Sequence, residues 1–265
     1  MYEFAYHRPG SVAEAAKLAG DHTEGKLLAG GQTLLPTMKQ RLAGPSDIID
    51  LSRLDDLRGI SVKDGVVTIK ALTRHVTVAT SAEVRAAIPA LAELAGMIGD
   101  PAVRNKGTIG GSVANNDPAA DYPSACLALG ATITTNKRAI KADDFFKGMF
   151  ETALEEGEII TSISFPVPEK ANYQKFRNPA SRYALVGVFV AKTGGHVRVA
   201  VTGAGAKGVF RVKDFEAALD ANFAPAALDG KSVPASGLNS DIHADAEYRA
   251  HLITVMAKRA VAAAG

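Results

Sequence analysis

Two glycine pairs in similar surroundings constrain this chain more than any other feature. The first lies in "KLLAGGQTLLPTMKQ", residues 26–40, and the second in "KGTIGGSVANNDP", residues 106–118. Glycine permits positive φ angles and a close approach of the backbone to a ligand. The first pair is predicted to lead into a short helix at Leu34. The second is predicted to form a turn ahead of a helix that starts near Asp121.

A pair of such turns is suited to holding a diphosphate group. A diphosphate carries fixed negative charge, and holding it away from water requires many hydrogen-bond donors. Backbone N–H groups beside glycine and at a helix N-terminus supply such donors. Two turns that face each other can grip a diphosphate from both sides, with further donors from the hydroxyls of Thr33, Thr108 and Ser112. Either pair alone is equally consistent with an ordinary tight turn.

Composition sets bounds on the class of protein. A length of 265 residues suggests one large domain or two modest ones, and 47% hydrophobic with 22% charged residues predicts a packed core. A net charge of +2 without a basic stripe argues against nucleic-acid binding. No apolar run reaches the roughly 18 residues of a membrane span, and the N-terminus lacks a signal-peptide pattern. The cytoplasm is therefore the expected location.

The order of elements predicts an α+β fold. Ser11 and Glu14 form a capping box ahead of an alanine-rich helix, which opens a small β-α-β unit. From about residue 170 three consecutive strands read as an antiparallel meander, followed by two helices. A domain boundary is expected near residues 167–171, where "PVPEK" interrupts the pattern. Further elements are predicted as strands at 26–29, 47–51, 66–72, 131–135 and 157–166, and as helices at 82–98, 213–220 and 245–263.

The other sequence motifs give little evidence of a catalytic site or of a second binding site. "GAGAKG", residues 203–208, matches G-x-G-x-x-G, but β-prone "VFRV" follows it, so a turn between strands is favoured over a dinucleotide site. The six histidines show no metal-binding spacing, and we expect no metal site and no catalytic residue. The single cysteine, Cys126, can neither close a disulfide within the chain nor hold an iron–sulfur cluster.

Longer stretches around both glycine pairs carry a family resemblance. "LLAGGQTLLPTMKQRLAGP" and "TIGGSVANNDPAADYPSACLALGA" resemble the two flavin-diphosphate loops of the FAD-binding medium subunit of molybdenum hydroxylases. The similarity extends to "FAYHRPGSVAEA", "EIITSISFP" and "KFRNPASRYALVGV", so it covers essentially the whole chain. The most similar patterns are those of aerobic carbon monoxide dehydrogenase medium subunits and of the xanthine dehydrogenase flavin domain.

The resemblance implies an FAD-binding domain over residues 1–168, with a small β-α-β subdomain, about 1–57, and a larger α+β subdomain, about 58–168. Residues 169–265 would form a C-terminal domain with a three-stranded antiparallel sheet and helices, lying over the isoalloxazine. Asp121, expected as an exposed loop carboxylate, would bind the ribityl chain. The residues implied to bind FAD are Ala29, Gly30, Gly31, Gln32, Thr33, Thr108, Ile109, Gly110, Gly111, Ser112, Asn115, Asp121, Ile160, Arg177 and Tyr183.

The resemblance also implies a function in electron transfer. Electrons would arrive from a small iron–sulfur subunit, and substrate would be oxidised on a large molybdopterin subunit, in a dimer of heterotrimers. "SRYA", residues 181–184, replaces acidic residues of xanthine dehydrogenase, so NAD, oxygen, a quinone or another carrier all stay open as the oxidant. Two other classes also stay open: a self-contained flavin reductase resembling enolpyruvoyl-glucosamine reductase, and a non-catalytic nucleotide-binding module.

Overall fold

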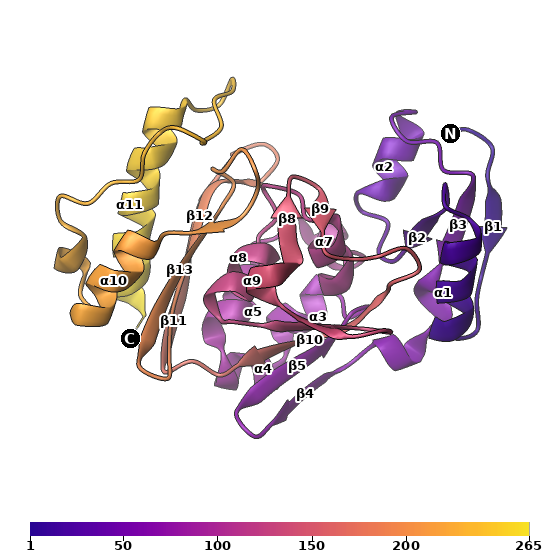
Figure 1. The fold of residues 1–265 in the computed structure, drawn as a ribbon, viewed down its shortest axis with the longest axis horizontal. Coiled ribbons are helices and arrows are strands. Elements are labelled where there is room, and N and C mark those ends of the chain that lie inside the picture. The colour runs from indigo at the N-terminus through magenta and orange to yellow at the C-terminus, as the bar shows by residue number, and fades with distance from the viewer. Residues whose placement is uncertain (265) are drawn as a thin grey trace.

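The computed structural model describes residues 1–264 and arranges the chain as three neighbouring units (Figure 1). A small parallel sheet with helix α1 (Val12–Asp21) lies at the N-terminal end. A five-stranded sheet with several short helices lies in the middle, and a second antiparallel sheet backed by two helices lies at the C-terminal end. The mixture of helices and antiparallel strands confirms the predicted α+β class.

The small unit is the predicted β-α-β arrangement, extended by one strand. Its sheet has the order β1-β3-β2 with all neighbours parallel. Ser11 accepts a hydrogen bond from the Glu14 N–H at 3.1 Å, as the capping box predicts, while the Glu14 carboxylate accepts one from the Gly10 N–H. The elements are β1 (Ala5–His7), α1 (Val12–Asp21), β2 (Lys26–Leu28), α2 (Leu34–Lys39), β3 (Asp47–Asp50), and the 3-10 turns η1 (Leu51–Arg53) and η2 (Asp55–Leu57).

The middle unit is built on a fully antiparallel sheet of order β4-β5-β10-β6-β7. The predicted helix over 82–98 is divided in two at Ile88, because Pro89 has no N–H to continue a helix and instead starts the next one. The strands are β4 (Ile60–Lys63), β5 (Val66–Lys70), β6 (Thr132–Thr135), β7 (Ala139–Lys141), β8 (Phe146–Gly148), β9 (Glu151–Thr152) and β10 (Ile160–Pro166). The helices are α3 (His75–Thr80), α4 (Ala82–Ala87), α5 (Pro89–Gly96), α6 (Pro101–Arg104), α7 (Ile109–Asn115), α8 (Tyr122–Ala128) and α9 (Ala142–Phe145).

The C-terminal unit contains the predicted meander and adds a short fourth strand to it. Residues alternate along β12, so Val188 packs with the helices α10 and α11, whereas Phe189 belongs to the core of the middle unit. The sheet is therefore covered on both faces (Figure 1). The elements are β11 (Lys170–Arg177), β12 (Ala184–Thr193), β13 (His196–Thr202), β14 (Phe210–Arg211), α10 (Lys213–Ala221), η3 (Pro225–Leu228) and α11 (Ala246–Ala263).

The stretch "GAGAKG" is the turn between β13 and β14, and no helix opens from it. The dinucleotide interpretation of this motif is therefore excluded, as the sequence predicted. Among the helices of residues 1–264, none combines the length and the apolar character that crossing a membrane requires.

Candidate functional site

The two glycine loops lie against each other, as the sequence led us to expect. A β-carbon built on Gly30 would lie 2.3 Å from the carbonyl oxygen of Lys106 and 2.7 Å from the Cα of Gly107. One built on Gly111 would lie 3.6 Å from the Cβ of Ala29. These separations leave no room for a side chain at position 30, so a glycine there is what lets the loops meet.

The second loop differs from its predicted form, because helix α7 begins directly at Ile109. Thr108 is its N-cap, and the threonine hydroxyl accepts a hydrogen bond from the Gly111 N–H at 3.2 Å. The glycine pair is thus the first turn of a helix rather than a turn ahead of one. Sequence reasoning missed this helix because two adjacent glycines have low helix propensity, which the Thr108 cap and tertiary packing override here.

Helix α7 is anchored to the chain segment that leads from β5 into α3. The N–H groups of Ile109 and Gly110 donate to the carbonyls of Thr73 and Ala71 at 3.1 and 2.8 Å. A β-carbon on Gly110 would lie 2.6 Å from the Cβ of Ala71. The second loop therefore has most of its donors occupied within the protein, and Gly110 serves close packing.

The first loop is the one with free donors. Gly31 adopts a φ of 70°, which glycine accepts without strain. Within residues 1–264, the backbone N–H groups of residues 30–33 donate to no protein acceptor, although helix α2 begins at the next residue. Consecutive unpaired N–H groups at the start of a helix fit an anion. The first loop therefore has N–H groups free for a ligand, whereas those of the second loop are mostly paired within the protein.

Both loops border one cleft of about 320 Å³, which also contains residues that sequence reasoning missed. Three of them are cations, Arg58, Arg74 and Lys106, which fit a group with two negative charges. Arg74 forms a single antiparallel β-bridge with Thr108, so it is placed by the second loop itself. Lys106 could have been noticed from its position just before "GTIGG"; Arg58 and Arg74 have no such signal. The complete lining is Leu28, Ala29, Gly30, Gln32, Leu35, Asp50, Ser52, Arg58, Leu72, Arg74, Lys106 and Thr108.

The carboxylate of Asp50 is the only negative side chain in this lining. It accepts hydrogen bonds from the Tyr6 hydroxyl at 2.5 Å and from the Ser52 N–H at 2.8 Å. Burial alone would raise the pKa of Asp50, but these bonds outweigh it and the pKa is lowered. Asp50 is thus an ionised, internally bonded group at the C-terminal end of β3.

His75 packs against Gly107, just before the second glycine pair. The backbone N–H of His75 donates to the Gly107 carbonyl at 3.0 Å, and a β-carbon on Gly107 would lie 2.6 Å from the ring Nε2 of His75. Burial, and to a lesser degree the charge of Arg104, lowers the pKa of His75 to about 4. The imidazole is therefore neutral near pH 7 and acts as a packing element.

Asp121 is not the exposed loop carboxylate that the sequence suggested. It is 4% exposed, accepts a hydrogen bond from the Tyr173 hydroxyl at 2.5 Å, and lies 2.9 Å from the ammonium of Lys175. Burial raises its pKa, while Lys175 and Tyr173 act in the opposite direction. The sequence could not show this environment because both partners come from β11, about fifty residues further along the chain.

The remaining predicted residues are spread more widely. Asn115 ends α7, Ile160 is buried at the start of β10, and Arg177 is exposed at the end of β11. Tyr183 is 50% exposed, and partial burial followed by the charges of Asp117 and Asp121 raises its pKa. The structure thus brings together the ten predicted residues of the two glycine loops, 29–33 and 108–112. Tyr183 lies close enough to Asp121 for the charge of that carboxylate to affect its pKa. No hydrogen bond within residues 1–264 connects Ile160 or Arg177 to those ten residues.

The neighbouring Asn116 has a structural role. It adopts a left-handed conformation, with φ 43°, and its amide donates to the carbonyls of Gly148 and Glu151 at 2.8 and 2.9 Å. These bonds hold the β8–β9 hairpin against the end of α7, so this amide is committed to the fold.

Comparisons with known proteins identify the family of this chain. Residues 2–168 match a family described as the FAD binding domain in molybdopterin dehydrogenase. The chain is 36% identical to the carbon monoxide dehydrogenase medium chain of Hydrogenophaga pseudoflava, over 98% of this chain and 96% of that one. It is 35% identical to the nicotine 6-hydroxylase medium subunit of Paenarthrobacter nicotinovorans, with coverage of 98% and 96%. The structure of reconstituted carbon monoxide dehydrogenase from Oligotropha carboxidovorans superposes with a TM-score of 0.90 at 32% identity, covering 99% of this chain and 97% of that chain.

The fold and the paired loops define a flavoprotein subunit of an oxidoreductase, with FAD as its cofactor. Within that class, the chain belongs to the FAD-binding medium subunits of the molybdenum hydroxylases. The resemblance found in the sequence is thereby confirmed.

Proposed function

We propose that the diphosphate of FAD lies in the cleft between the two glycine loops. The observation that carries this proposal is the run of unpaired N–H groups at residues 30–33, which faces a second loop pressed against it. The hydroxyls of Thr33, Thr108 and Ser112 would add donors, and of these Thr108 lines the cleft itself. Arg58, Arg74 and Lys106 also line the cleft and would balance the charge. Ala29, Gln32, Ile109 and Gly110 would hold the two loops in shape.

We also propose contacts to the parts of FAD beyond the diphosphate, and these rest mainly on the family resemblance. Asp121 still has carboxylate lone pairs for a ribityl hydroxyl, although Lys175 and Tyr173 already occupy part of its capacity. Asn115, Ile160, Arg177 and Tyr183 keep the roles that the family resemblance implies. The division into an FAD-binding domain, residues 1–168, and a C-terminal domain, residues 169–265, agrees with the separate sheets and remains part of this proposal.

The chain would work as the electron-transfer component of a heterotrimer. Bound FAD supplies the capacity to accept electrons and to release them to an external acceptor. The names of the relatives, which are medium chains and medium subunits, support an assembly of several subunits. Partners of the iron–sulfur and molybdopterin type, a dimer of heterotrimers and a cytoplasmic location are the further parts of this proposal, and they follow from the family resemblance. Burial raises the pKa of the Cys126 thiol, so the one cysteine is a structural residue.

Purification from the native host under mild salt tests the assembly. We expect a stoichiometric iron–sulfur protein and a molybdenum protein to accompany the tagged chain, and acid to release all flavin as intact FAD. Recovery of the chain alone, with oxidation of an organic substrate at a normal enzymatic rate, would refute the relay function. Flavin that stays on the denatured chain would refute the non-covalent site. The reductase and nucleotide-module alternatives have no comparable support, since the relatives are dehydrogenase and hydroxylase subunits.

A further inference from the structure

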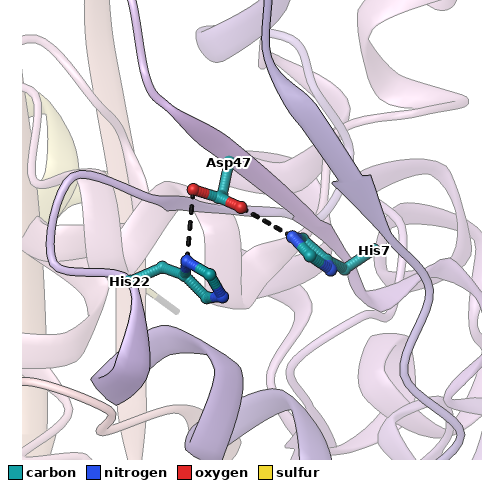
Figure 2. Close-up of side chains that lie close together, drawn as sticks. All are labelled: His7, His22 and Asp47. Atoms are coloured by element: carbon teal, nitrogen blue, oxygen red, sulfur yellow. Dashed lines mark hydrogen bonds and ion pairs between the residues drawn. The ribbon is translucent and has the colours of Figure 1, made fainter.

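Three potential metal ligands that lie far apart in the sequence meet at the N-terminal end of the molecule. His7 ends strand β1, His22 follows helix α1, and Asp47 begins strand β3. Figure 2 shows both imidazole rings turned toward the carboxylate. The expectation of no metal site considered only the spacing of histidines along the chain, and such spacing cannot detect ligands from separate elements.

We propose that His7, His22 and Asp47 form a binding site for a divalent metal of the zinc class. His7 Nε2 lies 2.6 Å from Asp47 Oδ1, and His22 Nδ1 lies 3.3 Å from Asp47 Oδ2. All three ligand atoms lie within 4.8 Å of one another. Zinc binds imidazole nitrogen and carboxylate oxygen at about 2.0–2.2 Å, so the donors of a tetrahedral site are about 3.3 Å apart. The observed separations need only small side-chain shifts to match.

The fold holds these ligands on one face of the small sheet. In the parallel pairing of β1 with β3, Ala5 is opposite Asp47 and His7 is opposite Ile49, so His7 and Asp47 point to the same side. Ile49 packs with α1 on that side, and α1 ends at Asp21, which brings His22 to the cluster. All three ligands therefore rest on or beside regular elements, which fixes their positions.

The surroundings of the carboxylate are also organised. Asp47 is 7% exposed, and the Ser46 hydroxyl donates to its Oδ2 at 2.7 Å, a bond of the kind that orients metal-ligating carboxylates. A β-carbon on Gly25 would lie 3.3 Å from the Cβ atoms of both His22 and Asp47, so the turn after α1 closes tightly over them. The two imidazoles are partly exposed, which leaves room for water as a fourth ligand.

Without a metal, His7 is hydrogen-bonded to Asp47, and His22 lies 3.3 Å from the same carboxylate. The His7 ring and the Ser46 hydroxyl are both bonded to the Asp47 carboxylate, which holds its oxygens in the cluster. Metal binding replaces ring protons at His7 Nε2 and His22 Nδ1. In the neutral imidazoles these protons move to His7 Nδ1 and His22 Nε2, and no electron transfer is involved.

The position of the site points to a structural function. Asp47 and Asp50 lie at opposite ends of β3, about 10 Å apart at the usual rise of a strand, and Asp50 lines the cofactor cleft. A metal at Asp47 would tie β1 to the end of α1 and to β3, at the end of the sheet away from the cleft. It would stabilise the small unit without taking part in flavin binding.

Zinc titration of the untagged, chelator-treated protein with its FAD bound tests the proposal. We expect one Zn²⁺ per chain. His22→Ala and Asp47→Asn should weaken binding at least about 100-fold, since loss of even an outer-shell partner costs about 10–100-fold. His251→Ala, on the exposed side of α11, is the matched control and should bind as the wild type does. Weak binding that is equal in the wild type and the cluster variants would overturn the proposal.

A second measurement on the wild type avoids dependence on the folding of variants. Diethyl pyrocarbonate modifies accessible imidazoles, and mass spectrometry identifies the modified residues. Zinc should protect His7 and His22 by more than tenfold while leaving His251 as reactive as before. Equal reactivity of His7 and His22 with and without zinc would overturn the site, whereas FAD content should stay constant in either case.

Discussion

The ammonium nitrogen of Lys175 lies 2.9 Å from a carboxylate oxygen of Asp121, and both side chains are almost fully buried. The Tyr173 hydroxyl donates to the same carboxylate at 2.5 Å. Lys175 and Tyr173 belong to β11, whereas Asp121 directly precedes α8. This buried group therefore joins the segment after the second glycine loop to the C-terminal sheet.

Replacing Lys175 by methionine should lower the free energy of unfolding by about 3–5 kcal/mol, because a buried carboxylate loses its counter-charge. Adding Asp121→Asn to that variant should recover part of the loss, since no buried charge then remains. Urea denaturation without added FAD measures both, so that a change in FAD affinity at Asp121 does not enter the comparison. A Lys175→Met variant as stable as the wild type would show that the pair contributes nothing.

Gly111→Val should raise the Kd for FAD by more than about tenfold while the fold is retained. A side chain there would press on the Thr108 hydroxyl, 3.0 Å from the added β-carbon, and would project toward the first loop beside Ala29. Loss of charge-assisted hydrogen bonds of about 1.5–3 kcal/mol corresponds to this change in affinity. Flavin fluorescence titration provides the measurement.

Gly20→Val is the matched control for this loop variant, because a β-carbon at Gly20 meets no atom within 4 Å. Gly205→Ala is unsuitable, since its β-carbon would lie 2.4 Å from the Gly208 carbonyl oxygen. If Gly20→Val lost FAD and Gly111→Val kept it, the site would not lie between the two loops.

Neutralising the cations of the cleft should weaken binding of the diphosphate selectively. Lys106→Gln and Arg74→Gln are each expected to reduce affinity for ADP by about tenfold or more, and to leave affinity for adenosine nearly unchanged. Lys63→Gln, on exposed strand β4, controls for net charge. If affinity for ADP and affinity for adenosine fell equally, these cations would not lie at the diphosphate. Calorimetric titration distinguishes the outcomes.

His75 should make the protein less stable in mild acid. Its pKa falls from 6.5 to about 4 on folding, so the unfolded chain binds more protons than the folded chain between these values. Stability is therefore full above pH 6.5 and declines as the pH falls toward 4, by up to about 3 kcal/mol. His75→Gln should flatten this part of the curve of unfolding free energy against pH.

Glu158 provides an internal control for that experiment. The hydrogen bond from Arg138 lowers its pKa from 4.5 to about 2, so its contribution is present above pH 4.5 and is lost between pH 4.5 and 2. The His75→Gln variant should keep this lower phase. An unchanged slope between pH 6.5 and 4 in the variant would contradict the function assigned to His75.

Local sequence patterns were sufficient for several features of this protein. The capping box at Ser11, the α+β class, the meander after residue 170 and the turn at Gly203 all follow from neighbouring residues. Their physical basis is short-range: side-chain caps, period-two alternation and glycine conformations act within a few residues. The family resemblance rests on such motifs in a fixed order.

Other features depended on contacts between distant segments. Helix α7 starts at Ile109 because Thr73 and Ala71 accept the N–H groups of Ile109 and Gly110. Asp121 is buried because β11 covers it with Tyr173 and Lys175. His7, His22 and Asp47 meet only when β1, α1 and β3 pack. The sequence by itself determined many of the local elements and the family of the chain. Tertiary structure alone decided which polar groups are paired, buried or free, because those states depend on neighbours that the chain brings in from far away.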